Sequence, residues 1–156
     1  MKMKNIIIII LAFSLIGCKI HNPKNDLNNK LIKISKIVSN TNQPFTFHLD
    51  SLTNFNWDHL FIFGPYTYSE DIDSILGFSW NSFDKYSMEY NEGHFLLVFT
   101  LNQKVIYDLI YSRKYGDFNK IKRTIIKRKD AIFTLKKDYE CKVPWLNYYI
   151  TRSSIN

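Results

Sequence analysis

Apolar and polar positions alternate along several parts of the chain in the way that strands require. Residues 45–49 follow a period of two, which is typical of a strand that buries one face. Residues 57–63 end in a continuous apolar run, which predicts a strand near the centre of a sheet. Residues 94–101 and 104–111 are rich in β-branched and aromatic side chains on either side of Asn102-Gln103, and they predict a hairpin.

Two other segments follow the helical period. Apolar residues at spacings of 4, 3 and 4 predict an amphipathic helix over 28–39, and they are Leu27, Leu31, Ile34 and Val38. Thr67 and Glu70 stand three positions apart, which is the spacing of a capping box, in which the two side chains close the first turn of a helix. A second helix is therefore expected over 68–76, and Gly77 is suited to end it.

The rest of the chain adds strands of lower regularity. We expect an irregular strand around 83–89 and two neighbouring strands at 120–127 and 131–136. The tail at 139–150 carries apolar residues and is expected to pack back on the core. The sequence thus predicts an α+β fold, a mainly antiparallel sheet of five to seven strands with one or two short helices, in one domain over 30–156.

The first residues have the pattern of a secretory signal. Lys2 and Lys4 precede an apolar run of 11 residues, 6–16. Eleven residues are too few to span a bilayer, which takes about 20, but they suit the apolar region of a signal peptide. We therefore expect residues 1–17 to be a signal peptide that is cleaved from the chain.

The run ends in Leu15-Ile16-Gly17-Cys18, which resembles the lipobox of bacterial lipoproteins. The resemblance implies that diacylglycerol is attached to the thiol of Cys18, that cleavage follows Gly17, and that the new amino group is acylated. Two or more acyl chains anchor a protein stably. Residues 18–29 are then the lipidated cysteine and a polar, asparagine-rich tether, and the partner is the membrane that holds the lipid.

The residues that follow Cys18 bear on localisation. Lys19 comes directly after the predicted anchor, and residues 19–25 contain no acid. Acidic residues there would resemble the inner-membrane retention or surface-export signals of some bacterial lipoproteins. We therefore expect a protein of the cell envelope that faces the periplasm.

Charge is divided unevenly along the chain. Residues 19–111 carry 7 basic and 10 acidic side chains, whereas residues 112–156 carry 12 and 4, a net charge of +8. The densest part, which we call the basic rim, consists of Lys120, Lys122, Arg123, Lys127, Arg128 and Lys129. Nucleic acid is not expected as the partner of an exported protein. Anionic lipid head groups or an acidic protein fit better, and the alternative is a solvated strand edge without a ligand.

The faces of the two basic strands can also be predicted. If 120–127 and 131–136 are neighbours, the side chains that supply the buried side are Ile121, Ile125, Ile132, and with them Phe133 and Leu135. The lysines and arginines then lie along one rim of the sheet. The adjacent Ile125 and Ile126 interrupt the period of two, which indicates a bulge or a strand buried on both faces.

Residues that could carry chemistry are few. The sequence has no phosphate-binding glycine loop, serine elbow, zinc signature or calcium loop, so we expect no cofactor, no metal and no catalytic residue. The neighbours Asp58 and His59 suggest an acid–base pair, but adjacent residues of a strand point to opposite faces, so we expect them not to act together. Cys141 remains without a partner once Cys18 carries lipid.

The segment 55–67 has the most distinctive order of residues. It reads Phe-Asn-Trp-Asp-His-Leu-Phe-Ile-Phe-Gly-Pro-Tyr-Thr and resembles a segment of small bacterial lipoproteins, a resemblance that implies no activity. A ligand pocket built on Trp57, Asp58 and Tyr66 is one interpretation. The other is a purely structural connection from a strand into a helix.

These patterns leave three classes of function open. The first is a lipid-anchored, non-catalytic binding or envelope-accessory module. The second is an immunity-type protein that neutralises an exported toxin through a charged face. The third is an enzyme, which would need a cleft with converging titratable groups, and no pattern in the sequence indicates one.

Overall fold

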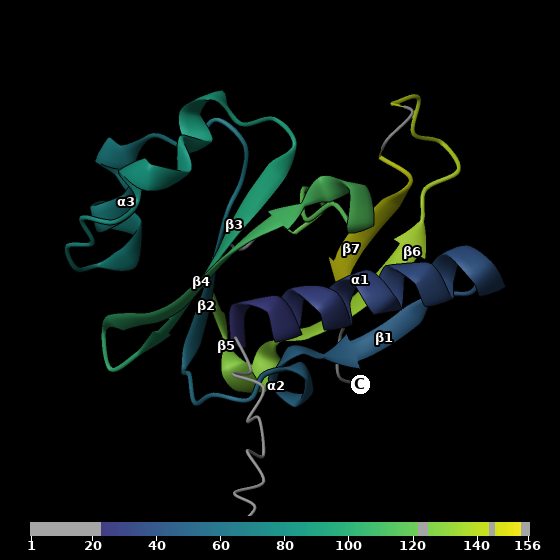
Figure 1. Cartoon of the computed structure of the whole chain (residues 1–156), viewed down its shortest axis with the longest axis horizontal. Coiled ribbons are helices and arrows are strands. Elements are labelled where there is room, and N and C mark those ends of the chain that lie inside the picture. Colours follow the sequence, from purple (N-terminus) through teal and green to yellow (C-terminus); the bar gives the residue numbers. More distant parts are fainter. Residues whose placement is uncertain (1–22, 122–124, 144–145, 154–156) are drawn as a thin grey trace, which may run out of the picture.

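The computed structural model describes residues 23–121, 125–143 and 146–153. Its strands form two antiparallel sheets (Figure 1). The three-stranded sheet has the order β1-β6-β7, with β1 (Phe45–His48), β6 (Ile132–Lys137) and β7 (Tyr148–Arg152). The four-stranded sheet has the order β4-β3-β2-β5, with β2 (His59–Phe63), β3 (His94–Leu101), β4 (Lys104–Ser112) and β5 (Ile125–Lys127).

Helices cover both sheets. The described residues form three α-helices, namely α1 (Pro23–Thr41), α2 (Leu49–Leu52) and α3 (Ser69–Leu76). The same part of the chain contains four single 3₁₀ turns, namely η1 (Asp84–Tyr86), η2 (Met88–Tyr90), η3 (Arg113–Tyr115) and η4 (Arg128–Asp130). The α+β class is confirmed, but the strands expected in one sheet are divided between two.

The four-stranded sheet is buried on both faces. One face joins α1 and the three-stranded sheet in a core that includes Leu60, Leu97 and Ile126. The other face packs against α3 and the 3₁₀ turns near it through residues such as Phe61 and Val98. This double burial explains the continuous apolar run in β2, which lies between β3 and β5 as predicted for a central strand.

The hairpin of β3 and β4 is also confirmed. Asn102 and Gln103 connect the strands, and both have left-handed backbones, with φ of 50° and 58°. Two residues with positive φ form the turn whose twist matches that of paired strands. The helix before Gly77 is confirmed too, since Gly77 ends α3 with φ of 76°.

Helix α1 begins earlier than expected. It starts at Pro23, so residues 23–29 are helical, where the composition indicated a tether. Proline is favoured in the first turn because its missing N–H has no helical partner there, and Leu27, 1% exposed, starts the buried face. Residues 1–22, with Cys18 and the rest of the predicted tether, lie outside the described residues. Within the described part of the chain, no helix has the length and apolar character to cross a membrane.

Two local predictions are wrong. Residues 83–89 form 3₁₀ turns in place of a strand, because Ser87 takes a left-handed backbone, with φ of 47°, and both Phe83 and Met88 turn into the core. The capping box does not form at α3. The Thr67 hydroxyl donates instead to the Gly64 carbonyl at 2.8 Å, and the N-cap residue is Tyr68.

The two basic strands are not neighbours. β5 pairs with β2, whereas β6 pairs with β1 and β7. The turn η4 directs the chain from one sheet to the other, and the tail returns as β7 to complete the second sheet, as its apolar residues predicted. The predicted faces of β5 are reversed, since Ile125 is 45% exposed and Ile126 is 1% exposed. β6 buries Ile132, Phe133 and Leu135.

Candidate functional site

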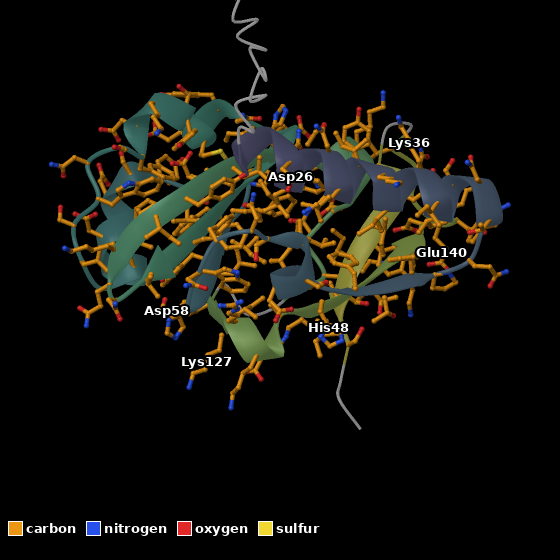
Figure 2. The ribbon with its side chains drawn as sticks, turned by 60° about the horizontal axis from the view of Figure 1, so that its bottom comes forward. Asp26, Lys36, His48, Asp58, Lys127 and Glu140 are labelled. Carbon is orange, nitrogen blue, oxygen red and sulfur yellow. The ribbon has the colours of Figure 1, made fainter. Side chains whose placement is uncertain are left out.

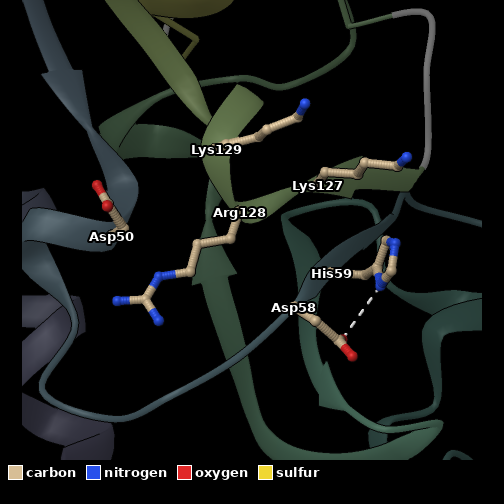
Figure 3. A pocket seen from close by; sticks show the side chains of 6 residues that line it. All are labelled: Asp50, Asp58, His59, Lys127, Arg128 and Lys129. Carbon is tan, nitrogen blue, oxygen red and sulfur yellow. Dashed lines mark ion pairs between the residues drawn. The ribbon is translucent and has the colours of Figure 1, made fainter.

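The corner where β5 turns into η4 combines most of the basic side chains with a hollow in the surface. An open hollow of about 610 Å³ lies there, which we call the basic hollow, and it is lined by Asp50, Asp58, His59, Lys127, Arg128 and Lys129 (Figure 3). The residues come from α2, the start of β2, β5 and η4. Chain segments far apart in the sequence therefore build one surface.

Backbone contacts hold this corner together. The Arg128 amide donates to the Asp58 carbonyl at 2.9 Å, and the Leu49 amide donates to the Ala131 carbonyl at 2.9 Å. In β5, Lys127 stands directly opposite His59 in the antiparallel register. Residues opposite each other in a sheet share a face, so both side chains lie at the same uncovered end of the four-stranded sheet.

Asp58 is the most constrained polar side chain of the hollow. It accepts hydrogen bonds from the Thr100 hydroxyl at 2.9 Å and from the Asn102 amide at 2.8 Å. Its Oδ1 also lies 3.1 Å from Nδ1 of His59. Partial burial acts to raise the pKa of Asp58, but the bonds from Asn102, Thr100 and His59 outweigh it, and the pKa lies below its ordinary value.

The contact of Asp58 with His59 corrects the expectation that they lie on opposite faces. β2 begins at His59, so Asp58 stands before the strand and the alternation of side chains does not apply to the pair. The Asp58 amide donates to the Thr100 carbonyl of β3 at 2.8 Å, but Asp58 itself lies outside the paired residues of β2 and β3. Asp58 therefore orients His59 beside the basic hollow (Figure 3).

The three consecutive cations of the hollow have no acidic partner among the described residues. No ion pair joins the side chains of Lys127, Arg128 or Lys129 to a described carboxylate, and both lysines are exposed. The guanidinium of Arg128 lies 5.9 Å from the ring centre of Trp57 and extends into the hollow on the side of Asp50 (Figure 3). Their positive charge is therefore open to a ligand.

An adjoining hollow of about 400 Å³ shares Asp58 and His59 with the basic one. We call it the apolar hollow after Phe61, Leu76, Phe78 and Ile125, which line it together with the polar residues Thr100, Asn102 and Gln103. It lies on the outer face of β5, where Ile125 and Lys127 are both exposed while Ile126 between them is buried. Cationic side chains and the exposed Ile125 thus lie together at the edge strand of the sheet.

The structure separates the residues of the predicted ligand pocket. Trp57 is 2% exposed, with its indole N–H donating to Thr53 Oγ1 at 3.0 Å. Asp58 lines both hollows. Tyr66 follows the opposite end of β2 with φ of 62°, and its amide donates to Met88. Five strand residues span roughly 17 Å, so Tyr66 and Asp58 do not share a site.

The basic rim is also divided. Lys127, Arg128 and Lys129 come together at the basic hollow. Lys120 lies in a turn beside the three-stranded sheet, where its ammonium is 3.5 Å from Asp138 and 3.7 Å from the ring centre of Tyr149. Lys122 and Arg123 lie outside the described residues. In Figure 2, Lys127 and Asp58 lie together at one side of the molecule, away from Glu140.

The contact of Asp58 with His59 is the feature of the corner that comes nearest to acid–base chemistry. Asp58 could orient His59 as a general base. The nearby Thr100 hydroxyl, however, donates to Asp58 at 2.9 Å and reaches only the backbone carbonyl of His59, at 3.5 Å. Among the described residues, no hydroxyl is hydrogen-bonded to the His59 imidazole in the way that activation of a nucleophile requires. Among the described residues, no three histidine, cysteine or acidic side chains are grouped to hold a metal ion. What the corner offers is an oriented imidazole beside open cationic side chains.

Comparisons of the chain with protein-family models, with curated proteins and with solved structures each found no match. The fold and the corner define a small α+β protein with a basic surface hollow.

Sequence reasoning found Lys127, Arg128, Lys129 and Asp58 but missed two members of the hollow. They are His59, which the alternation of strand residues predicts to act apart from Asp58, and Asp50, for which the sequence predicts no role. No local sequence pattern places either residue in the hollow. Asp50 reaches it only because α2 packs beside η4. For His59, the register opposite Lys127 is what places it there.

Proposed function

We propose that this chain is a lipid-anchored, non-catalytic binding module of the bacterial cell envelope, and that its basic hollow binds an anionic ligand. The signal-peptide pattern and the lipobox at Cys18 support the anchor. The observation that carries the binding role is the run of Lys127, Arg128 and Lys129 around an open hollow, without an acidic partner among the described residues.

The physical basis of the proposed binding is the long-range attraction of anions by unpaired positive charge. A cationic hollow concentrates anions from solution, and its attraction weakens as salt screens it. Asp58 does not cancel this charge fully, because Thr100, Asn102 and His59 already bind its carboxylate. Asp50 is the second acid of the lining, and it makes no ion pair with Arg128.

Pyrophosphate is a suitable probe of the hollow, titrated at low and at high salt and followed by backbone amide chemical shifts. We expect the shifts to centre on residues 58–59 and 127–129 and to weaken with salt. Lys127→Glu with Lys129→Glu should abolish them. The matched control is Lys114→Glu with Lys142→Glu, which changes the charge equally at two exposed lysines elsewhere. Shifts that centre on other residues, or that survive the first variant, would contradict the binding role.

The anchor has its own test. Cys18→Ser should abolish labelling of the chain by a fatty acid and leave the precursor uncleaved, because the thiol is the atom that receives the lipid. A mature chain that begins at any residue other than a blocked Cys18 would contradict the anchor. The result is independent of ligand binding at the hollow.

A further inference from the structure

The two hollows at the β5–η4 corner match the two chemical halves of a phospholipid. The basic hollow carries Lys127, Arg128 and Lys129. The lining of the apolar hollow beside it combines Phe61, Leu76, Phe78 and Ile125 with the polar residues Thr100, Asn102 and Gln103. They share Asp58 and His59, so one ligand can contact both. An anion with an apolar portion fits this surface better than a purely polar anion, which would use the basic hollow alone.

The exposed aliphatic side chain is the second observation. Ile125 is 45% exposed on an edge strand and points to the same face as Lys127 two residues on. Helix α3 covers this face of the sheet only as far as Leu76, and His59, opposite Lys127, remains half-exposed. Cations beside exposed aliphatic groups are the composition of surfaces that rest in the head-group region of a bilayer.

The position of the corner relative to the chain start is the third observation. Cys18 and Pro23 are five residues apart, so the chain between them reaches at most about 18 Å. Lys30, seven residues into α1, donates from its ammonium to the Leu52 carbonyl of α2 at 2.9 Å. α2 in turn supplies Asp50 to the basic hollow. The packing therefore connects the first turns of α1 with the corner through one short helix.

We propose that the ligand of the basic hollow is the anionic head group of a membrane phospholipid, and that the β5–η4 corner rests on the bilayer that holds the lipid anchor. This inference rests on the proposed function and names its ligand. The phosphate occupies the basic hollow against Lys127, Arg128 and Lys129. The glycerol and first methylenes lie along Ile125 and Phe78 in the apolar hollow.

The test uses the chain from residue 18 with Cys18→Ser, which retains every core residue of the described part and binds membranes without the help of a lipid. Sedimentation with phosphatidylcholine vesicles is compared with vesicles in which about a third of the lipid is phosphatidylglycerol. We expect clear binding only to the anionic vesicles. Each cation near such a surface contributes about fivefold, so Lys127→Glu with Lys129→Glu should lower the partition coefficient at least about 30-fold.

Two further variants distinguish binding of a lipid from attraction by net charge alone. Lys114→Glu with Lys142→Glu should leave vesicle binding within about twofold, since these lysines lie away from the corner. Ile125→Ser changes no charge and should weaken vesicle binding about fivefold through lost burial, while pyrophosphate binding stays unchanged. Unaltered thermal midpoints establish that each variant folds. Equal losses in both charge variants, or no loss in Ile125→Ser, would overturn the inference.

The remaining outcomes distinguish the inference from the proposed function. If pyrophosphate binds at the hollow but anionic vesicles bind no better than neutral ones, the lipid is the wrong ligand and the anionic site stands. If soluble polyglutamate binds more tightly than the vesicles, the partner is an acidic protein and the inference is overturned. If none of the three probes binds at the hollow, both proposals fail.

Discussion

Two arginines of this protein, Arg113 and Arg128, have their charged groups in opposite environments. Arg113 is buried, and its Nε and Nη2 donate to Asp117 Oδ2 at 3.1 and 2.7 Å while Nη1 donates to the Glu92 carbonyl at 2.8 Å. Arg128 is half-buried against Trp57, and no described carboxylate pairs with it. Burial of a charge without partners costs a large desolvation free energy, whereas a charge at the rim of an open hollow remains solvated by water.

The difference between the two arginines is that one charge supports the fold and the other does not. The Arg113–Asp117 pair ties η3 to the bridge between Asp117 and Tyr149 of β7, so it holds the tail against the rest of the chain. The three cations of the Arg128 corner make no ion pair with a described carboxylate, and backbone hydrogen bonds of Arg128 make its structural contacts. Charges that stabilise the fold and charges that are available to a ligand thus lie in different parts of the molecule.

The largest expected effect comes from breaking the buried pair. Asp117→Ala leaves the Arg113 guanidinium without its carboxylate and should lower the free energy of unfolding by about 3–5 kcal/mol. Chemical denaturation measures the loss. Arg113→Met with Asp117→Leu should cost less than the single change, because no uncompensated charge stays buried. A single-variant loss below about 1 kcal/mol would show that water reaches the pair.

A smaller effect is expected at Asp58 and depends on pH. Asp58→Asn removes charge-assisted bonds from Thr100 and Asn102 and should cost about 1 kcal/mol at neutral pH. The pKa of Asp58 lies below its ordinary value of 3.8 in the folded protein, so its contribution is complete above that value and is lost as pH falls through the folded pKa. The gap in thermal midpoint between wild type and Asp58→Asn should therefore close in acid. A gap that is constant from neutral pH to acid would contradict the shifted pKa.

The smallest effect is expected at the open cations. Lys127→Ala with Lys129→Ala should change the free energy of unfolding by no more than about 0.5 kcal/mol, because exposed charges without partners contribute little to stability. Thermal unfolding of the variant beside wild type measures this. A loss as large as that at Asp117 would mean that these lysines support the fold, and the contrast between the two corners would then disappear.

Local patterns predicted the elements whose determinants are close in the sequence. The hairpin of β3 and β4 follows from two segments rich in β-branched and aromatic residues on either side of Asn102 and Gln103. The end of α3 follows from Gly77, because glycine adopts positive φ at little cost in free energy. The apolar spacing in α1 predicts its buried face but not its start at Pro23. The candidate site was predicted in part, since the basic run was evident and its division between two sheets was not.

The sequence by itself determined the α+β class, the central position of β2 and the consecutive cations at 127–129, because each depends on neighbouring residues. Only the tertiary structure decided which sheet each strand joins, which face of β5 is buried and which side chains share the hollow. β5 is only three residues long, and Ile125 and Ile126 are equally apolar, so local preference favours neither face. Pairing with β2 in one register resolves this, and the same register brings His59 opposite Lys127.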